Sequence, residues 1–268
     1  MRQIFVIFGM ALLFLLAVTG LQPVGAANVD ENSPTVLITG SNRGIGLAFA
    51  KNYAEQGWNV LATCRKPESA DDLKAVQAEY PRVQIEQLDV TDHSRIDFLA
   101  DKYKDQPIDL LINNAAILGT LPEQKVGGLN FELFQKVMAI NVYGPLKMSE
   151  AFADHVAASE QKKIVALSSG LGSLSTTGNM PGFYYYRISK AGLNMAMRGL
   201  RTDLKDRGII VALIAPGMVG TQLLADSGWT GKSLTTEDSV AGMSKIIAAL
   251  TPEDKGTITN TDGKTIPW

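Results

Sequence analysis

Residues 35–46 read Thr-Val-Leu-Ile-Thr-Gly-Ser-Asn-Arg-Gly-Ile-Gly, and this stretch decides the fold. Its first five residues are apolar or β-branched and predict a short buried strand. Gly40, Gly44 and Gly46 then have the spacing Gly-x-x-x-Gly-x-Gly. Glycines let a backbone turn tightly and approach a pyrophosphate, which rests at the positive N-terminus of the following helix. The stretch therefore predicts a strand, a phosphate-binding loop and a helix. The alternative is a glycine-rich loop that binds no ligand.

Strands and helices alternate along the rest of the chain. The expected strands are 35–39, 59–64, 83–88, 109–112, 163–167, 209–214 and 256–259. The expected helices are 44–56, 71–79, 93–103, 131–156, 186–207 and 236–250. Such alternation is typical of an α/β domain whose parallel sheet is covered on both faces by helices, here with about seven strands. Ligands bind beyond the carboxyl ends of the strands in these sheets.

The composition excludes several classes of protein. Hydrophobic residues make up 46% of the chain, which supports a large core, and the net charge of −2 gives no general attraction to nucleic acid. Cys64 is the single cysteine, so no internal disulfide is possible. His93 and His155 have no cysteine or second histidine at ligand spacing, and we expect no metal site.

Residues 1–27 differ in kind from the rest. Arg2 precedes an apolar run over 4–18, and Val24, Ala26 and Ala27 are small residues suited to signal-peptidase cleavage. This pattern predicts a cleaved secretory signal peptide and a secreted or periplasmic protein, with 28–34 as a linker to the domain. The alternative is an uncleaved membrane anchor through residues 4–21, whose length is near the lower limit for a span.

A second set of motifs lies further along the chain, one in an expected helix and two after expected strands. Tyr186-Arg-Ile-Ser-Lys190 lies in a helical stretch, where side chains four residues apart share one face. Ser168-Ser169 follows one apolar run and Pro216-Gly-Met-Val-Gly-Thr221 follows another. Together with the glycine loop, in this order, these motifs predict a protein that transfers hydride from a nicotinamide. A half-buried aromatic is the alternative for Tyr186.

The end of the second strand distinguishes the two nicotinamide cofactors. An acidic residue there would bind the adenosine ribose and repel a 2′-phosphate. The run Ala-Thr-Cys-Arg-Lys over 62–66 has no acid, and Arg65 and Arg43 can both approach that corner and bind a phosphate. We therefore expect a preference for NADP(H), with NAD(H) as the alternative. The two arginines are otherwise ordinary surface residues.

Position at the ends of strands predicts the other cofactor contacts. Residues after the third and fourth strands would lie near adenine and ribose, and the Thr221 hydroxyl near the nicotinamide amide. A helix cap is the alternative for Thr221. The predicted cofactor-binding set is Gly40, Asn42, Arg43, Gly44, Ile45, Gly46, Arg65, Asp89, Val90, Asn113, Ala115, Lys190, Pro216, Gly217, Val219 and Thr221.

From residue 35 to the end, these ordered motifs resemble those of the classical short-chain dehydrogenases/reductases. The run 256–268 and the Tyr-Arg-x-Ser-Lys motif are similar to the branch of sniffer-type carbonyl reductases and C-factor proteins. The resemblance implies a single Rossmann-type doubly wound parallel sheet that forms an NAD(P)-binding catalytic domain over 35–268. It further implies Tyr186 as proton donor and acceptor, Lys190 as its partner, Ser169 as the residue that holds the substrate oxygen, and Asn141 in a proton relay. A homodimer or homotetramer is also implied.

The interval between Ser169 and Tyr186 is longer than in most of that family, and Ser173 has the commoner spacing. We favour Ser169 because it directly follows a strand and is therefore rigidly placed, while 174–180 lengthens the loop. Hydride addition to a carbonyl leaves an alkoxide that needs a proton. We expect the Lys190 ammonium, together with an oxidised nicotinamide in a dry site, to lower the tyrosine pKa from its free value near ~10. We expect Ser169 to donate to the oxyanion.

The sequence thus predicts an NADP(H)-dependent oxidoreductase that transfers hydride between nicotinamide and a carbonyl or alcohol substrate, with Tyr186 as general acid and base. Leu223, Leu224, Trp229 and Met180 indicate an apolar substrate pocket, although such residues also serve plain packing. One alternative is a nicotinamide-binding signalling or sensor protein of C-factor type. A second is a sugar epimerase or dehydratase, which shares Tyr-x-x-x-Lys but usually needs a longer C-terminal region.

Overall fold

A continuous sheet runs through the computed structural model, which describes residues 29–176, 181–254 and 256–268. Its eight strands follow the order β3-β2-β1-β4-β5-β6-β7-β8. All neighbours pair in parallel except β7 and β8, which are antiparallel. The strands are β1 (Thr35–Thr39), β2 (Asn59–Cys64), β3 (Val83–Gln87), β4 (Leu110–Asn113), β5 (Lys163–Leu167), β6 (Ile210–Ala215), β7 (Ile258–Asn260) and β8 (Thr265–Ile266).

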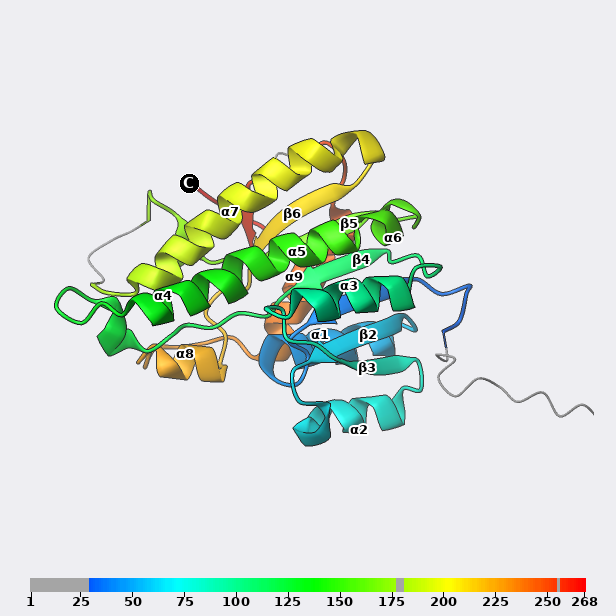
Figure 1. Ribbon diagram of the computed structural model, residues 1–268, viewed down its shortest axis with the longest axis horizontal. Helices are drawn as coiled ribbons and strands as arrows, with labels where there is room; N and C mark the ends of the chain where they lie inside the picture. Colours follow the sequence, from blue (N-terminus) through cyan, green and yellow to red (C-terminus); the bar gives the residue numbers. More distant parts are fainter. Residues whose placement is uncertain (1–28, 177–180, 255) are drawn as a thin grey trace, which may run out of the picture.

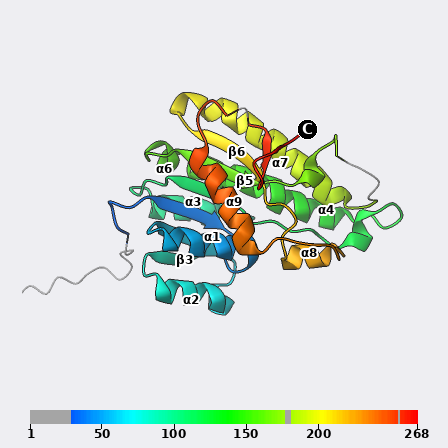
Figure 2. The same cartoon turned by 180° about the vertical axis from the view of Figure 1, so that it is seen from behind.

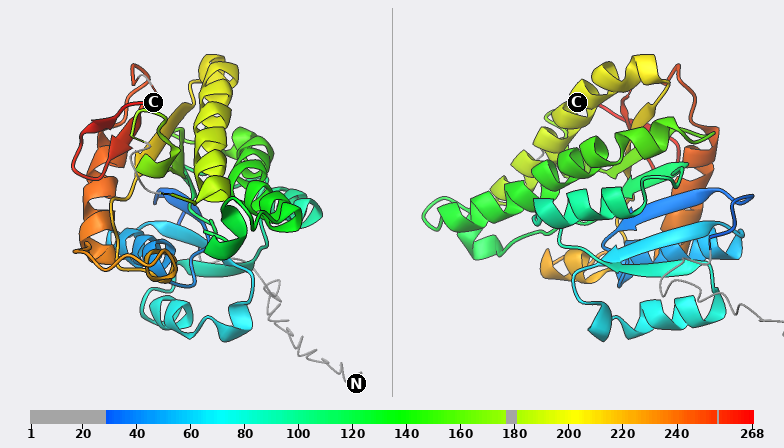
Figure 3. Two further views of the ribbon diagram at one scale, coloured as in Figure 1. Left: turned by 90° about the vertical axis from the view of Figure 1, so that its left-hand side faces the viewer. Right: turned by 45° about the vertical axis from the view of Figure 1, so that its right-hand side comes forward.

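Helices cover both faces of this sheet (Figures 1 and 3). The helices are α1 (Gly44–Glu55), α2 (Asp71–Glu79), α3 (His93–Lys102), α4 (Phe131–Met138), α5 (Gly144–Ala151), α6 (Ala153–Ala157), α7 (Tyr184–Leu204), α8 (Gln222–Asp226) and α9 (Thr236–Ala249). Apolar side chains of α3, α5 and α7 form one core with the sheet, and those of α1, α2 and α9 form the other. Seen from behind, α1 and α9 lie in front of the sheet (Figure 2).

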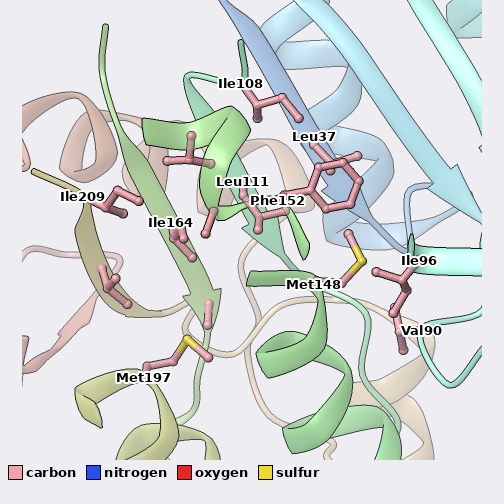
Figure 4. Packing of buried hydrophobic residues seen from close by; sticks show 14 of the residues in the cluster. Leu37, Val90, Ile96, Ile108, Leu111, Met148, Phe152, Ile164, Met197 and Ile209 are labelled. Carbon is pink, nitrogen blue, oxygen red and sulfur yellow. The ribbon is translucent and has the colours of Figure 1, made fainter. Parts of the chain in front are cut away.

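The core explains why the strands read as continuous apolar runs. Every residue of β1, β2, β4 and β5 is buried, because helices pack on both faces. Figure 4 shows Leu37, Leu111 and Ile164, from three neighbouring strands, packed with Met148 of α5 and Phe152 at its end. The predicted doubly wound α/β sheet is confirmed. The expected number of strands was one too low, because β8 is only two residues long and has no readable periodicity.

The expected long helix over 131–156 is wrong, because the chain forms three helices there. Between α4 and α5, residues Ala139–Tyr143 widen into a π-helical turn, in which Gly144 donates to the Ala139 carbonyl. Pro145 has no N–H and cannot bond the carbonyl of Asn141 four residues earlier, as an α-helix would require. A second break at Phe152 separates α5 from α6. The π turn places Asn141 at the bend.

The expected leader, residues 1–27, lies outside the described residues. Over 29–176, 181–254 and 256–268, no helix is long and apolar enough to cross a bilayer. The expected linker is tied to the domain from Asp30 onward. The Asp30 N–H donates to the Asn59 side chain at 2.9 Å, and the Asp30 carboxylate pairs with Arg82 at 3.0 Å.

Candidate active site

A cavity of about 1210 Å³ opens at the carboxyl ends of the strands. The loops after β1, β4, β5 and β6 border it, together with residues of α7 and α8. Most of the residues predicted for the site line it, namely Gly40, Asn42, Arg43, Gly44, Ile45, Gly46, Arg65, Asp89, Val90, Ala115, Ser169, Tyr186, Lys190, Pro216, Gly217, Val219 and Thr221. Asn113 and Asn141 do not line the cavity, and both are buried behind it.

The glycine loop has room for backbone only. A Cβ atom on Gly46 would meet the Gly40 carbonyl oxygen at 2.2 Å and the Asn114 amide nitrogen at 2.6 Å, so only glycine fits. The Asn114 side chain holds this loop to the end of β4, donating to the carbonyls of Thr39 at 2.7 Å and Gly40 at 3.1 Å. A cradle of this shape at the start of α1 fits a pyrophosphate.

Asn114, and not Asn113, faces the glycine loop. Successive side chains of a strand point to opposite faces of the sheet. Asn113 closes β4 on the face of α5, where it donates to the Ser149 hydroxyl at 3.1 Å. The alternation along Leu110–Asn113 is the signal that would have assigned the two asparagines to different faces.

A polar corner extends the cavity at the ends of β2 and β3. This second hollow of about 680 Å³ is lined by Asn42, Arg43, Arg65, Lys66, Ser69, Gln87, Asp89, Asp92 and Arg95. Arg43 and Arg65 are exposed and border both hollows. Cys64 is 2% exposed and lines neither hollow. Of the residues at the end of β2, it is therefore Arg65, and not Cys64, that can contact a cofactor and bear on the preference for NADP(H). The corner can hold a phosphate between two guanidinium groups.

Tyr186, Lys190 and Ser169 come together in the cavity. The Lys190 ammonium lies 5.7 Å from the centroid of the Tyr186 ring and donates to the Leu167 carbonyl at 2.7 Å. The Ser169 side chain lies close enough to the Tyr186 phenol to lower its pKa by hydrogen bonding, and its hydroxyl accepts the Leu171 N–H at 3.1 Å. Successive turns of α7, which carry Tyr186 and Lys190, thus lie beside the segment after β5 that carries Ser169.

Burial dominates the electrostatics of Tyr186 and Lys190 in the chain alone, and the lowering of the tyrosine pKa by Lys190 with an oxidised nicotinamide stays a prediction. Burial raises the pKa of Tyr186 to about 12, and the hydrogen bond with Ser169 opposes that rise. Burial also lowers the pKa of the Lys190 ammonium to about 8. Desolvation disfavours the charged form of each group. The buried phenol is therefore held as a proton donor, which is the form that carbonyl reduction consumes.

The structure separates the two candidate serines. Ser169 faces the cavity, whereas Ser173 is 2% exposed and lies outside the cavity lining. The Ser173 hydroxyl accepts the Thr176 N–H at 3.2 Å within its own loop. The loop between them is held to α7, because Asn194 accepts from Ser168 and donates to the Gly172 carbonyl.

Asn141 joins two segments that are distant in sequence. Its side chain accepts the Ile117 N–H at 2.9 Å, donates to the Ile117 carbonyl at 2.9 Å, and donates to the Ser189 hydroxyl at 3.0 Å. These bonds fix the loop after β4 against α7. Its role in a proton relay stays a prediction.

The sequence analysis identified only part of the apolar wall of the cavity. Leu118, Phe183 and Tyr186 form a buried cluster, against which Leu121, Leu171 and Leu223 pack. Leu223, Leu224 and Trp229 line the cavity as expected, and Met180 lies outside the described residues. The Thr221 hydroxyl borders the cavity and also caps α8 by accepting the Leu224 N–H. Leu118 and Phe183 sit in irregular segments, where periodicity gives no signal.

Comparison with known proteins identifies the family of the chain. The family model described as short chain dehydrogenase matches residues 34–230. The 1-hydroxy-2-glutathionyl-2-methyl-3-butene dehydrogenase of Rhodococcus sp. (strain AD45) is 33% identical over 238 residues, covering 87% of this chain and 99% of that protein.

Two solved structures share the fold and most of the length. NADPH-bound carbonyl reductase from chicken fatty liver has a TM-score of 0.80 and 30% identity, over 88% of this chain and 99% of that chain. The carbonyl reductase Sniffer of D. melanogaster has a TM-score of 0.78 and 26% identity, over 88% and 100%. The match of the family model to most of the chain, and the coverage of the relatives, show that the chain belongs to the short-chain dehydrogenase family.

Proposed function

We propose that the protein is an NADP(H)-dependent oxidoreductase that transfers hydride between the nicotinamide and a carbonyl or alcohol substrate. One observation carries this proposal: Tyr186, Lys190 and Ser169 meet in a cavity that also contains the glycine loop. NADPH would supply hydride to the substrate carbon. An assay of purified protein with NADPH and a panel of aldehydes and ketones, followed by nicotinamide absorbance, tests it. A cofactor that binds without any turnover would favour the signalling or sensor alternative.

The side chains of the site can bind the substrate oxygen, supply its proton and orient the cofactor. Ser169 can donate to the oxygen on which negative charge develops, and Tyr186 can give that oxygen a proton. The Lys190 ammonium keeps two donors besides the one bonded to Leu167, enough to orient a ribose hydroxyl beside the phenol. The Leu118 and Phe183 side chains keep water from the phenol, and so strengthen these interactions.

NADPH should serve better than NADH, since Arg43 and Arg65 border the corner where a 2′-phosphate would lie. Arg65→Ala should lower kcat/KM with NADPH about 10- to 100-fold and leave the value with NADH nearly unchanged, as expected for a lost bond to a charged group. Steady-state kinetics with both cofactors measure this. Arg82→Ala is the matched control, because Arg82 pairs with Asp30 away from the cavity. Equal use of both cofactors by the unaltered protein would contradict the preference.

The substrate is proposed to be a small apolar carbonyl compound or alcohol. The cluster of Leu118, Phe183 and Leu171 beside Tyr186 supports this, as does the position of Trp229 at the cavity wall. Apolar side chains around a few polar groups are the usual lining of small-molecule sites.

Export through a cleaved signal peptide is proposed for the whole protein, on the basis of Arg2, the apolar run 4–18 and the small residues before position 28. N-terminal sequencing of protein from its native host should then find a start near Ala27. An intact Met1 in the membrane fraction would select the anchor through residues 4–21. An intact Met1 on soluble cytoplasmic protein would exclude both proposals.

Assembly into a homodimer or homotetramer is proposed as well. Phe131 of α4 and Ile188 and Met195 of α7 are 69%, 47% and 72% exposed, and they supply apolar surface on two neighbouring helices. Light scattering of the purified protein measures the assembly directly, and a monomer at micromolar concentration would contradict it.

A further inference from the structure

Gln124 connects the backbone of the candidate catalytic tyrosine to the wall of the substrate cavity. It ends the short 3-10 turn Leu121–Gln124, and it is 0% exposed. Its Oε1 accepts the N–H of Tyr186 at 3.1 Å, and its Nε2 donates to the carbonyl of Leu118 at 2.8 Å. These two bonds fix the orientation of the side-chain amide. The Tyr186 N–H needs the amide oxygen as its acceptor, and the Leu118 carbonyl needs the amide N–H as its donor.

The bond to Tyr186 meets a need of helix α7. The first N–H groups of a helix have no partner within it, and a side chain at the N-cap usually accepts one of them. The N-cap residue of α7 is Phe183, which has a φ of 59° and no side-chain acceptor. Tyr186 is the third residue of the helix, and Gln124, 62 residues earlier, supplies the missing acceptor. The cap of α7 therefore comes from the segment that follows β4.

The other end of Gln124 holds the cavity wall. Leu118 packs in the same buried cluster as Phe183 and Tyr186. Gly119 follows it with a φ of 78°, and a Cβ there would lie 3.0 Å from the Gln124 Nε2. A fully buried amide with both ends bonded is a rigid connection, because breaking either bond leaves an unpaired polar group away from water.

We propose that Gln124 is a positioning residue, which fixes the phenol of Tyr186 and the wall at Leu118 as one unit. The inference rests on the proposed oxidoreductase function, since it assigns to Gln124 the alignment of the proton donor with the substrate. Loss of the amide should let the first turn of α7 and the loop 115–124 shift independently. A misplacement of about 1 Å at a reacting group costs up to about 100-fold in rate.

Gln124→Met tests the proposal by removing both hydrogen bonds at similar volume. We expect kcat for carbonyl reduction to fall about 10- to 100-fold, with the Kd for NADPH unchanged in a fluorescence titration. The matched control is Gln106→Met, which removes the bond from Gln106 Nε2 to the Thr35 hydroxyl at the opposite end of the sheet. That control should lose stability without losing kcat. An unchanged kcat in folded Gln124→Met would overturn the inference.

Gln124→Glu supplies a readout that a purely structural role would not move, and it decides the question if the Met variant does not fold. A protonated glutamic acid can accept from Tyr186 and donate to Leu118, whereas the carboxylate would oppose the Leu118 carbonyl with a second acceptor. Burial raises the pKa of such a carboxyl. The ratio of kcat between Gln124→Glu and the unaltered protein should therefore rise as the pH falls, toward parity.

Dividing kcat of Gln124→Glu by kcat of the unaltered protein at each pH separates the titration of the introduced carboxyl from that of other groups. Glu123 and Lys125 flank Gln124 in the chain, Tyr186 bonds to it from α7, and Lys190 lies against the Tyr186 ring, and these titratable groups are present in both proteins. A ratio that stays at unity over the whole pH range, or stays low at every pH, would overturn the inference. Failure of the unaltered protein to turn over any carbonyl compound would instead defeat the proposed function.

Discussion

Tyr186→Phe should reduce carbonyl turnover about 100- to 10,000-fold while the Kd for NADPH stays the same. Proton transfer by a positioned side chain contributes a factor of this size, and the substitution removes only the hydroxyl. The ring would remain in its cluster with Leu118 and Phe183. Single-turnover kinetics with NADPH and a carbonyl substrate measure the loss, and titration of cofactor fluorescence measures the affinity.

Tyr185→Phe is the matched control for this experiment. Tyr185 is its neighbour in α7, is 5% exposed, and packs edge-on against Phe134 outside the cavity lining. Its hydroxyl is not placed to reach a substrate, so turnover should be unchanged. Turnover that survives in Tyr186→Phe, or falls equally in both variants, would remove Tyr186 from the role of proton donor.

Ser169→Ala should lower kcat about 100- to 1000-fold, the cost of removing one donor from a developing oxyanion. Ser169 borders the cavity beside Tyr186, so its hydroxyl can donate to a substrate oxygen there, and that contact would strengthen as negative charge forms. The measurement is kcat with the same carbonyl substrate, alongside the melting temperature of the variant.

Ser173→Ala provides the comparison that separates the two serines. Its hydroxyl is outside the cavity lining and accepts the Thr176 N–H within its own loop, so its removal should cost stability of about 1 kcal/mol and little kcat. A larger loss of kcat in Ser173→Ala than in Ser169→Ala would transfer the oxyanion role to Ser173.

Local patterns were sufficient for the sheet and most of the site. The apolar strand runs reflect burial on both faces, and each motif at the end of a strand lies at one edge of the sheet, since the strands from β1 to β7 are parallel. Local sequence patterns failed where an element was very short, or where a residue's position depended on contacts with residues distant in sequence. The strand β8 is too short to recognise, and no local pattern links Asn141 to its hydrogen-bond partner Ile117, 24 residues earlier.

The sequence by itself determined most of the order of strands and helices along the chain and the shared face of Tyr186 and Lys190, because these depend on neighbouring residues alone. Only the tertiary structure decided how those residues behave. Burial holds the Tyr186 phenol protonated and lowers the pKa of Lys190, and burial is a sum over the whole chain. The bond between Gln124 and Tyr186 joins residues 62 positions apart. No local pattern carries such a contact, because its energy exists only once both segments have been folded onto the same sheet.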